Sequence, residues 1–130
     1  MSDQDHINAA CQTQSSLAGF DLWLLVGEWT PAMNDCAKYL NGRGVGSRYA
    51  ADVGSCDGVT GSGSTFSSSY KTFLRQAWEA QVISYEKVTD GWLQWTWKAE
   101  DADEWSYQAG LQYGWIPQNP TNYIYPNICG

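Results

Sequence analysis

Glu28 is the residue whose type and position most clearly favour chemistry. It lies between Gly27 and Trp29, at the carboxyl end of a mostly apolar run over 20–29. Parallel β/α folds place their active sites at this end of the strands. A carboxylate among aromatic rings suits glycoside hydrolysis, because it faces an oxocarbenium-like transition state while ring faces hold the sugar. A structural carboxylate, paired with an arginine or with backbone N–H groups, fits the residues equally well.

Trp95 and Trp97 are a second pair of candidates. They lie two residues apart in an aromatic run over 92–97, which we expect to be a strand, so both share one face of the sheet. Residue type alone favours a core role for them. The alternative is an indole at the mouth of the sheet that stacks on a sugar ring.

The remaining reactive side chains give weaker signals. The acidic residues Glu100, Asp101, Asp103 and Glu104 predict a solvated loop, with a calcium site as the alternative, although their spacing is irregular. His6 is the only histidine and is interpreted as structural, and no G-x-S-x-G motif accompanies it. Four cysteines without a C-x-x-C pair favour disulfides over zinc. We therefore expect no metal and no cofactor.

The elements that must position these residues form a strand–helix–strand unit. A strand over 20–29, buried on both faces, precedes Thr30-Pro31, which predicts the start of a helix that ends before Asn41-Gly42. Residues 42–69 are rich in glycine and serine and predict a long surface loop. The strongest helical periodicity spans 70–87, ahead of the second strand. Shorter helices are expected over 2–12 and 103–111, before a tail that contains prolines.

Composition narrows the class of protein. Among 130 residues, 15% are aromatic and the net charge is −7, which excludes disorder as the main state and argues against nucleic acid or anionic membranes as partners. No apolar run reaches the roughly 18 residues of a membrane span. The residues after Met1 carry no secretory signal peptide, whereas the cysteines favour an oxidising compartment. We therefore expect the natural N-terminus to lie elsewhere.

Several segments resemble a known family. The longest are VGEWTPA at 26–32 and NDCAKYLNG at 34–42, and further matches are GSRY at 46–49, GSC at 54–56, GWLQWTWKAE at 91–100 and YPNICG at 125–130. Together they resemble the fungal exo-β-1,3-glucanases in family 5 of the glycoside hydrolases. The resemblance covers practically the whole chain, but those enzymes are about three times longer, as expected for a barrel of ~250 residues with insertions.

The resemblance implies an α/β fold that is the C-terminal third of a (β/α)8 TIM barrel. Residues 1–130 are then a partial catalytic domain that holds strands 7 and 8 with their flanking helices. In this alignment Glu28 is the catalytic nucleophile, and Trp95 is the platform under the sugar at the cleavage point. Asn41, Trp29 and Arg48 are expected to line the pocket.

The resemblance also shows what the chain lacks. The family's acid/base glutamate lies in an Asn-Glu-Pro motif, which does not occur here, and retaining hydrolysis needs two carboxyl groups about 5 Å apart. The other candidates, Glu79, Glu86, Glu100 and Glu104, do not match that motif. We therefore expect a fragment of a retaining enzyme that releases glucose from β-1,3-glucan ends, and we expect the isolated chain to be inactive.

Two alternatives to a glucan-hydrolysing function remain. A non-catalytic carbohydrate-binding module would use the same exposed aromatic residues, and a product without function is the third possibility.

We predict disulfides Cys11–Cys129 and Cys36–Cys56, which would tie the tail to the first helix and pin the glycine- and serine-rich loop, and the resemblance supports the same pairing. The parent enzyme is then expected to be secreted or to reside in the cell wall, with β-glucan as its partner.

Overall fold

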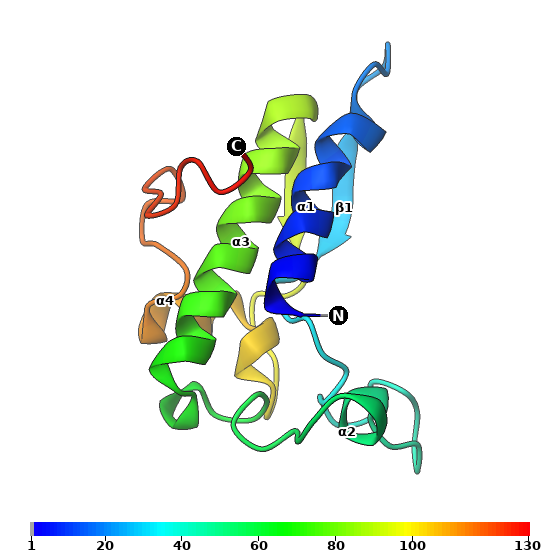
Figure 1. Ribbon diagram of the computed structural model, residues 1–130, viewed down its shortest axis with the longest axis vertical. Helices are drawn as coiled ribbons and strands as arrows, with labels where there is room; N and C mark the ends of the chain where they lie inside the picture. Colours follow the sequence, from blue (N-terminus) through cyan, green and yellow to red (C-terminus); the bar gives the residue numbers. More distant parts are fainter. Residues whose placement is uncertain (1) are drawn as a thin grey trace.

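The fold is an α-helical layer on one side of a two-stranded parallel sheet (Figure 1). The structure, a computed structural model, describes residues 2–130. In chain order the elements are α1 (Asp3–Leu17), β1 (Leu25–Trp29), α2 (Arg48–Asp52), α3 (Ser68–Val88), β2 (Gly91–Gln94) and α4 (Tyr107–Tyr113), with single 3-10 turns at Gly63–Thr65 and Asp103–Trp105. Within this range, no helix is both long enough and apolar enough to cross a membrane.

The predicted strand–helix–strand unit is confirmed. β1 and β2 pair in parallel, with Leu25 opposite Gly91 and Val26 opposite Trp92, and α3 connects back to β2 as the periodicity over 70–87 predicts. Ser67 begins α3 because its hydroxyl accepts the Tyr70 N–H, which satisfies one of the free donors of the first turn.

Helix α3 is the centre of the molecule because it packs on two sides. One face carries Leu74, Trp78 and Val82, which pack with Trp29 and Trp115. The other carries Phe73, Ala77 and Ala80, which pack against Ile7 and Ala10 of α1. Small alanine side chains let α1 approach closely, so the two helices lie side by side (Figure 1).

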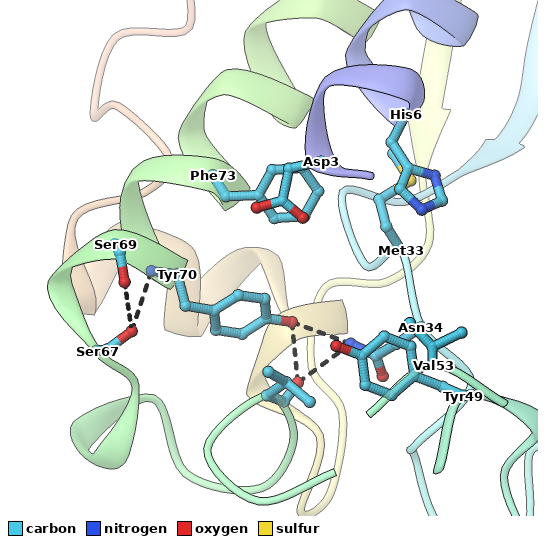
Figure 2. A pocket seen from close by; sticks show the side chains of 11 residues that line it. Asp3, His6, Met33, Asn34, Tyr49, Val53, Ser67, Ser69, Tyr70 and Phe73 are labelled. Carbon is cyan, nitrogen blue, oxygen red and sulfur yellow. Dashed lines mark hydrogen bonds between the residues drawn. The ribbon is translucent and has the colours of Figure 1, made fainter. Parts of the chain in front are cut away.

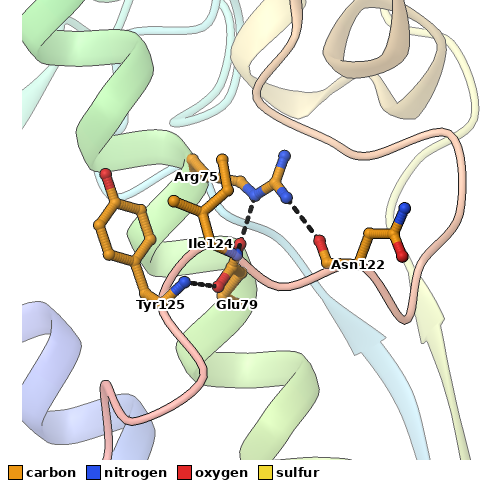
Figure 3. Close-up of polar contacts among 5 residues, drawn as sticks. All are labelled: Arg75, Glu79, Asn122, Ile124 and Tyr125. Carbon is orange, nitrogen blue, oxygen red and sulfur yellow. Dashed lines mark hydrogen bonds and ion pairs between the residues drawn. The ribbon is translucent and has the colours of Figure 1, made fainter.

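A third side of α3 is covered by the C-terminal tail. Figure 3 shows the clasp: the Glu79 carboxylate, fully buried, accepts hydrogen bonds from the N–H groups of Ile124 (2.8 Å) and Tyr125 (2.6 Å). Arg75 pairs with the same carboxylate and donates to the carbonyl oxygen of Asn122 at 2.7 Å. The buried charge is thus compensated by a partner charge and by backbone donors, which is the condition for placing a carboxylate inside a protein.

Both predicted disulfides are present. Cys11 of α1 is bonded to Cys129, with the Cα atoms 5.3 Å apart, and Cys36 is bonded to Cys56, with the Cα atoms 5.6 Å apart. The first joins α1 to the tail beside the clasp. The second anchors the long loop after β1.

Three predictions about local structure are wrong. The strand over 20–29 forms only from Leu25, and it is not buried on both faces, since Trp23 is 89% exposed and Leu25 is also exposed. Over residues 2–130, no further strand pairs with this two-stranded sheet. The helix from Thr30-Pro31 to Leu40 is absent, and the segment is a series of turns. Asn34 accounts for part of this, because its side-chain oxygen accepts the Cys36 N–H and so competes with a helical bond.

Candidate functional site

The carboxyl ends of the two strands bring together the two main candidates for chemistry. Glu28 is the penultimate residue of β1, and Trp95 directly follows β2. The Trp95 N–H donates to the Trp29 carbonyl oxygen at 2.8 Å, so Glu28 and Trp95 lie at the ends of adjacent strands. The Glu28 side chain is exposed. This is the arrangement expected for a β/α active site.

Trp29 lies on the inner side of the sheet. Its ring is only 6% exposed and makes edge contacts with Tyr85 (centroids 5.5 Å apart) and Trp92 (5.1 Å). The side chain therefore belongs to the core and is shielded from any ligand in this chain. Trp29 can influence a pocket only indirectly, because its packing fixes the position of β1.

Trp95 faces outward and lines a cavity of about 260 Å³. Its ring is 56% exposed, so the interpretation as a core residue is wrong. The other walls include Tyr39, Leu40, Glu100 and Trp105. The peptide bond between Trp95 and Thr96 is cis.

Trp97 does not line this cavity, although it is also exposed. Its ring stacks on Tyr107 of α4, with centroids 6.0 Å apart. The expected strand over 92–97 ends at Gln94. The Trp95 N–H still bonds to β1, but from Thr96 onward the backbone pairs elsewhere: the Thr96 N–H donates to the Trp105 carbonyl oxygen, and the Tyr107 N–H donates to that of Thr96. The two indoles therefore do not share one face of a strand.

Asn41 and Arg48, the other expected pocket residues, are held by one carboxylate that the sequence analysis missed. Asp35 accepts hydrogen bonds from the Ser47 hydroxyl (2.6 Å), the N–H groups of Arg48 and Tyr49 (both 2.9 Å) and the Asn41 amide (2.8 Å). The Ser47 bond, followed by the two backbone bonds, holds the pKa of Asp35 well below its usual range. Asp35 therefore organises the loop from Asn41 to the start of α2.

Arg48 lines a second cavity, of about 410 Å³, which shares the walls Leu40 and Trp105 with the Trp95 cavity. The side chains of Arg48 and Trp95 thus border neighbouring hollows. Asn41 lines neither, since its amide is bonded to Asp35 and to the carbonyl oxygen of Gly46. Trp105, which separates the hollows, gave no signal in the sequence beyond its position after the acidic run.

The acidic run is not uniformly solvated as predicted, because Glu104 is fully buried. One carboxylate oxygen accepts the Thr60 hydroxyl at 2.6 Å, whereas the other has no partner in the described chain. Burial raises the pKa of Glu104 to about 7, the Thr60 bond opposes the rise, and Asp103 adds to it. Asp103 accepts the Gly63 N–H. Over residues 2–130, no three His, Cys, Asp or Glu side chains are grouped so as to hold a metal ion.

None of the other glutamates considered as a partner for Glu28 lies at the end of β1. Glu79 is held in the clasp, and Glu86 accepts hydrogen bonds from the Trp92 ring N–H (3.2 Å) and the Tyr123 hydroxyl (3.0 Å). Glu100 is exposed and lines the Trp95 cavity. The site supplies one exposed carboxylate at the end of β1, an exposed indole at the end of the adjacent strand β2 and a guanidinium in the neighbouring cavity. Glu28 itself does not line the Trp95 cavity.

Comparison with known proteins identifies relatives of this sequence. No protein-family model matches the chain. Curated relatives match it over nearly its whole length: a glucan 1,3-beta-glucosidase of Candida oleophila is 39% identical over 98% of this chain and 31% of its own length. A probable glucan 1,3-beta-glucosidase A of Aspergillus niger is 43% identical over 99% of this chain and 33% of its own length. The glucan 1,3-beta-glucosidase of Kluyveromyces lactis is 38% identical over 96% and 31%.

These matches confirm the resemblance to glycoside hydrolases drawn from the sequence. The chain is homologous to part of the fungal glucan 1,3-beta-glucosidases. It spans about one third of the length of these relatives.

Proposed function

We propose that the chain is the C-terminal third of a (β/α)8 glycoside hydrolase that removes glucose from the ends of β-1,3-glucan by a retaining mechanism. The observation that carries this proposal is the position of Glu28 beside Trp95 at the carboxyl ends of two adjacent parallel strands, in a chain related to glucan 1,3-beta-glucosidases throughout its length. Residues 1–130 are one part of the catalytic domain.

In the proposed reaction, Glu28 is the nucleophile. A carboxylate oxygen forms a bond to the anomeric carbon while the glycosidic C–O bond breaks, and the departing oxygen takes a proton from a carboxylic acid. Water then attacks the same carbon, gives its proton to that second carboxylate and releases Glu28. The second carboxyl group belongs to the part of the relatives' length that this chain does not span, so the isolated chain has no activity.

Trp95 provides the apolar surface under the glucose unit, because its exposed ring lies next to the nucleophile's strand. Arg48 contacts hydroxyls one cavity further on, and Asn41 supports it through their shared bonds to Asp35. Two disulfides fit a protein that is secreted or in the cell wall. β-Glucan is the partner that this set of residues fits.

The test is covalent labelling of Glu28. A chimaera is prepared in which this chain replaces the matching segment of the Candida oleophila relative, and it is incubated with a 2-deoxy-2-fluoroglucosyl fluoride. Glu28 should displace fluoride and retain one fluoroglucosyl group, which peptide mass spectrometry locates. The Glu28→Gln chimaera should remain unlabelled, and the isolated chain should be neither labelled nor active on laminarin. Label on another residue, or glucose release by the isolated chain, contradicts the proposal.

A carbohydrate-binding module is the second candidate, since Trp95 and Trp97 are both exposed. Such a module would bind laminarin through these rings and would need no partner carboxylate. It is supported if the isolated 130-residue chain binds laminarin without hydrolysing it, if Trp95→Ala abolishes that binding and if Glu28→Gln leaves it unchanged.

A further inference from the structure

A cleft of about 320 Å³ lies outside the proposed catalytic residues, between the first turns of α1 and α3 and the loops that follow β1. Figure 2 shows His6 and Asp3 coming from α1 and Tyr49 from α2, with Asn34 and Tyr70 between them. The ring of Phe73 closes the inner side, with its centroid 6.4 Å from that of His6. The sequence interpretation of His6 as purely structural gave no hint of this cleft.

Some polar side chains of the cleft are hydrogen-bonded to other residues that line it, and others are not. Tyr70 donates its hydroxyl to the Val59 carbonyl oxygen (2.9 Å), and the Asn34 amide donates to the same oxygen (3.3 Å) and to Tyr70 (3.1 Å). Asp3, His6 and Tyr49, by contrast, make no hydrogen bond to another lining residue in Figure 2. A carboxylate, an imidazole and a phenol hydroxyl thus line the cleft beside an aromatic wall without hydrogen bonds to the other lining residues.

The cleft continues into the proposed glucan site. It shares His6, Met33, Asn34, Tyr49 and Val53 with the Arg48 cavity, and that cavity shares Leu40 and Trp105 with the Trp95 cavity. The Trp95 cavity, the Arg48 cavity and the cleft at His6 therefore adjoin one another in this order. A ligand several units long that begins at Trp95 would pass over the shared walls Leu40 and Trp105, and then past Arg48, to reach the cleft.

We propose that the Asp3–His6–Tyr49 cleft binds glucose units of the glucan chain that lie several residues away from the bond being cleaved. The proposal rests on the function proposed above. Hydroxyl groups match this lining, because a carboxylate accepts from them and imidazole and phenol both donate and accept, while the aromatic wall covers the apolar face of a sugar. The Asp3 carboxylate and the net charge of −7 oppose an anionic ligand.

Substrate length provides the first test. In the chimaera, the isosteric double variant Asp3→Asn/Tyr49→Phe removes one charge and one hydroxyl from the cleft without changing its shape. It should raise KM for laminarin about fivefold or more, as expected for lost hydrogen bonds, and leave KM for an aryl glucoside unchanged. The matched control is Asp57→Asn/Tyr125→Phe, outside the three hollows. Unchanged KM for laminarin, or equal changes on both substrates, overturns the proposal.

Direct binding provides the second test and separates the two proposals. The oxidised 130-residue chain is titrated with laminarihexaose, and chemical shifts are followed by NMR. Shifts at His6 and Tyr49 that persist in Trp95→Ala but vanish in the cleft double variant support the cleft. Shifts confined to Trp95 and its neighbours overturn it. Failure of Glu28 labelling with intact shifts at His6 would reject the catalytic proposal alone.

Discussion

Trp29 and Trp95 are joined by one backbone hydrogen bond, yet their side chains occupy opposite environments. The Trp95 N–H donates to the Trp29 carbonyl oxygen at 2.8 Å, while the Trp29 ring is 6% exposed and the Trp95 ring is 56% exposed. Core packing therefore sets the position of β1, and that position sets where Trp95 stands beside Glu28. At the same level of the sheet, one indole is therefore packed in the core and the other is exposed to solvent.

Alanine substitutions should separate these two roles. Trp29→Ala removes a ring packed on Tyr85 and Trp92 and should lower the free energy of unfolding by about 3–5 kcal/mol. Trp95→Ala should change it by about 0.5 kcal/mol or less, because the ring is exposed. Urea denaturation of the isolated chain measures both values. Equal losses would show that Trp95 is part of the packed structure.

Asp35→Asn should loosen the loop that carries Asn41 and Arg48. The amide keeps the size of the side chain but loses the charge and one of the two acceptor oxygens, so the N–H groups of Arg48 and Tyr49 lose part of their hydrogen bonding. Hydrogen exchange of these two amides should accelerate, while amides of α3 keep their rates. Asp57→Asn, in the same long loop, is the control and should leave the Arg48 and Tyr49 rates unchanged.

Glu104 should make stability depend on pH between about 4.5 and 7. Its pKa in the folded chain is about 7, above the ordinary value of 4.5, so the folded state binds more protons than the unfolded state in this interval. The stabilising contribution is complete below pH 4.5 and is lost as the pH rises through 7, by roughly 3 kcal/mol at most. Glu104→Gln should flatten this part of the profile, whereas Glu100→Gln, an exposed residue of the same run, should preserve it. A profile that keeps its slope in Glu104→Gln contradicts the assignment.

Arg75→Met should destabilise the chain strongly. It leaves the Glu79 carboxylate buried with only the Ile124 and Tyr125 N–H groups as partners, and removing one member of a buried ion pair costs about 3–5 kcal/mol. Thermal or urea unfolding at constant pH measures the loss. Lys87→Met, on the exposed last turn of α3, should stay within about 0.5 kcal/mol of the parent chain.

Elements with strong local signals can be predicted from the sequence. The apolar spacing over 70–87 predicts α3 to within two residues of its start, because the spacing continues over about five turns. The parallel pair follows from the order of strand, helix and strand. The disulfide pairing was expected from the segments that it would tie together and from the family resemblance, and both bonds are present. The helix after Thr30 failed because side-chain acceptors from Asn34 and Asp35 hold turns instead, and such contacts depend on residues up to 14 positions away.

In the candidate site, too, some residues can be predicted from local sequence signals and others depend on contacts between distant segments. Glu28 and Trp95 could be selected from residue type and strand position. Asp35, Trp105 and the buried state of Glu104 could not, because each depends on which loop packs against which. Nothing in the four acidic residues between positions 100 and 104 marks Glu104 as the one whose carboxylate accepts the Thr60 hydroxyl. The exposure of Trp95 likewise depends on where β2 stops pairing, which is decided by the contact of Thr96 with Trp105.

The Cys11–Cys129 disulfide, with a sequence separation of 118, makes the chain nearly a covalent ring. All the elements from β1 to α4 lie within it, and Cys36–Cys56 closes a smaller ring around the exposed residues 42–46. Loops of this kind are where extracellular proteases cut first. A single cut there opens the rings without releasing a piece, so under oxidising conditions a nicked molecule gains only the mass of one water, and it separates into fragments only after reduction.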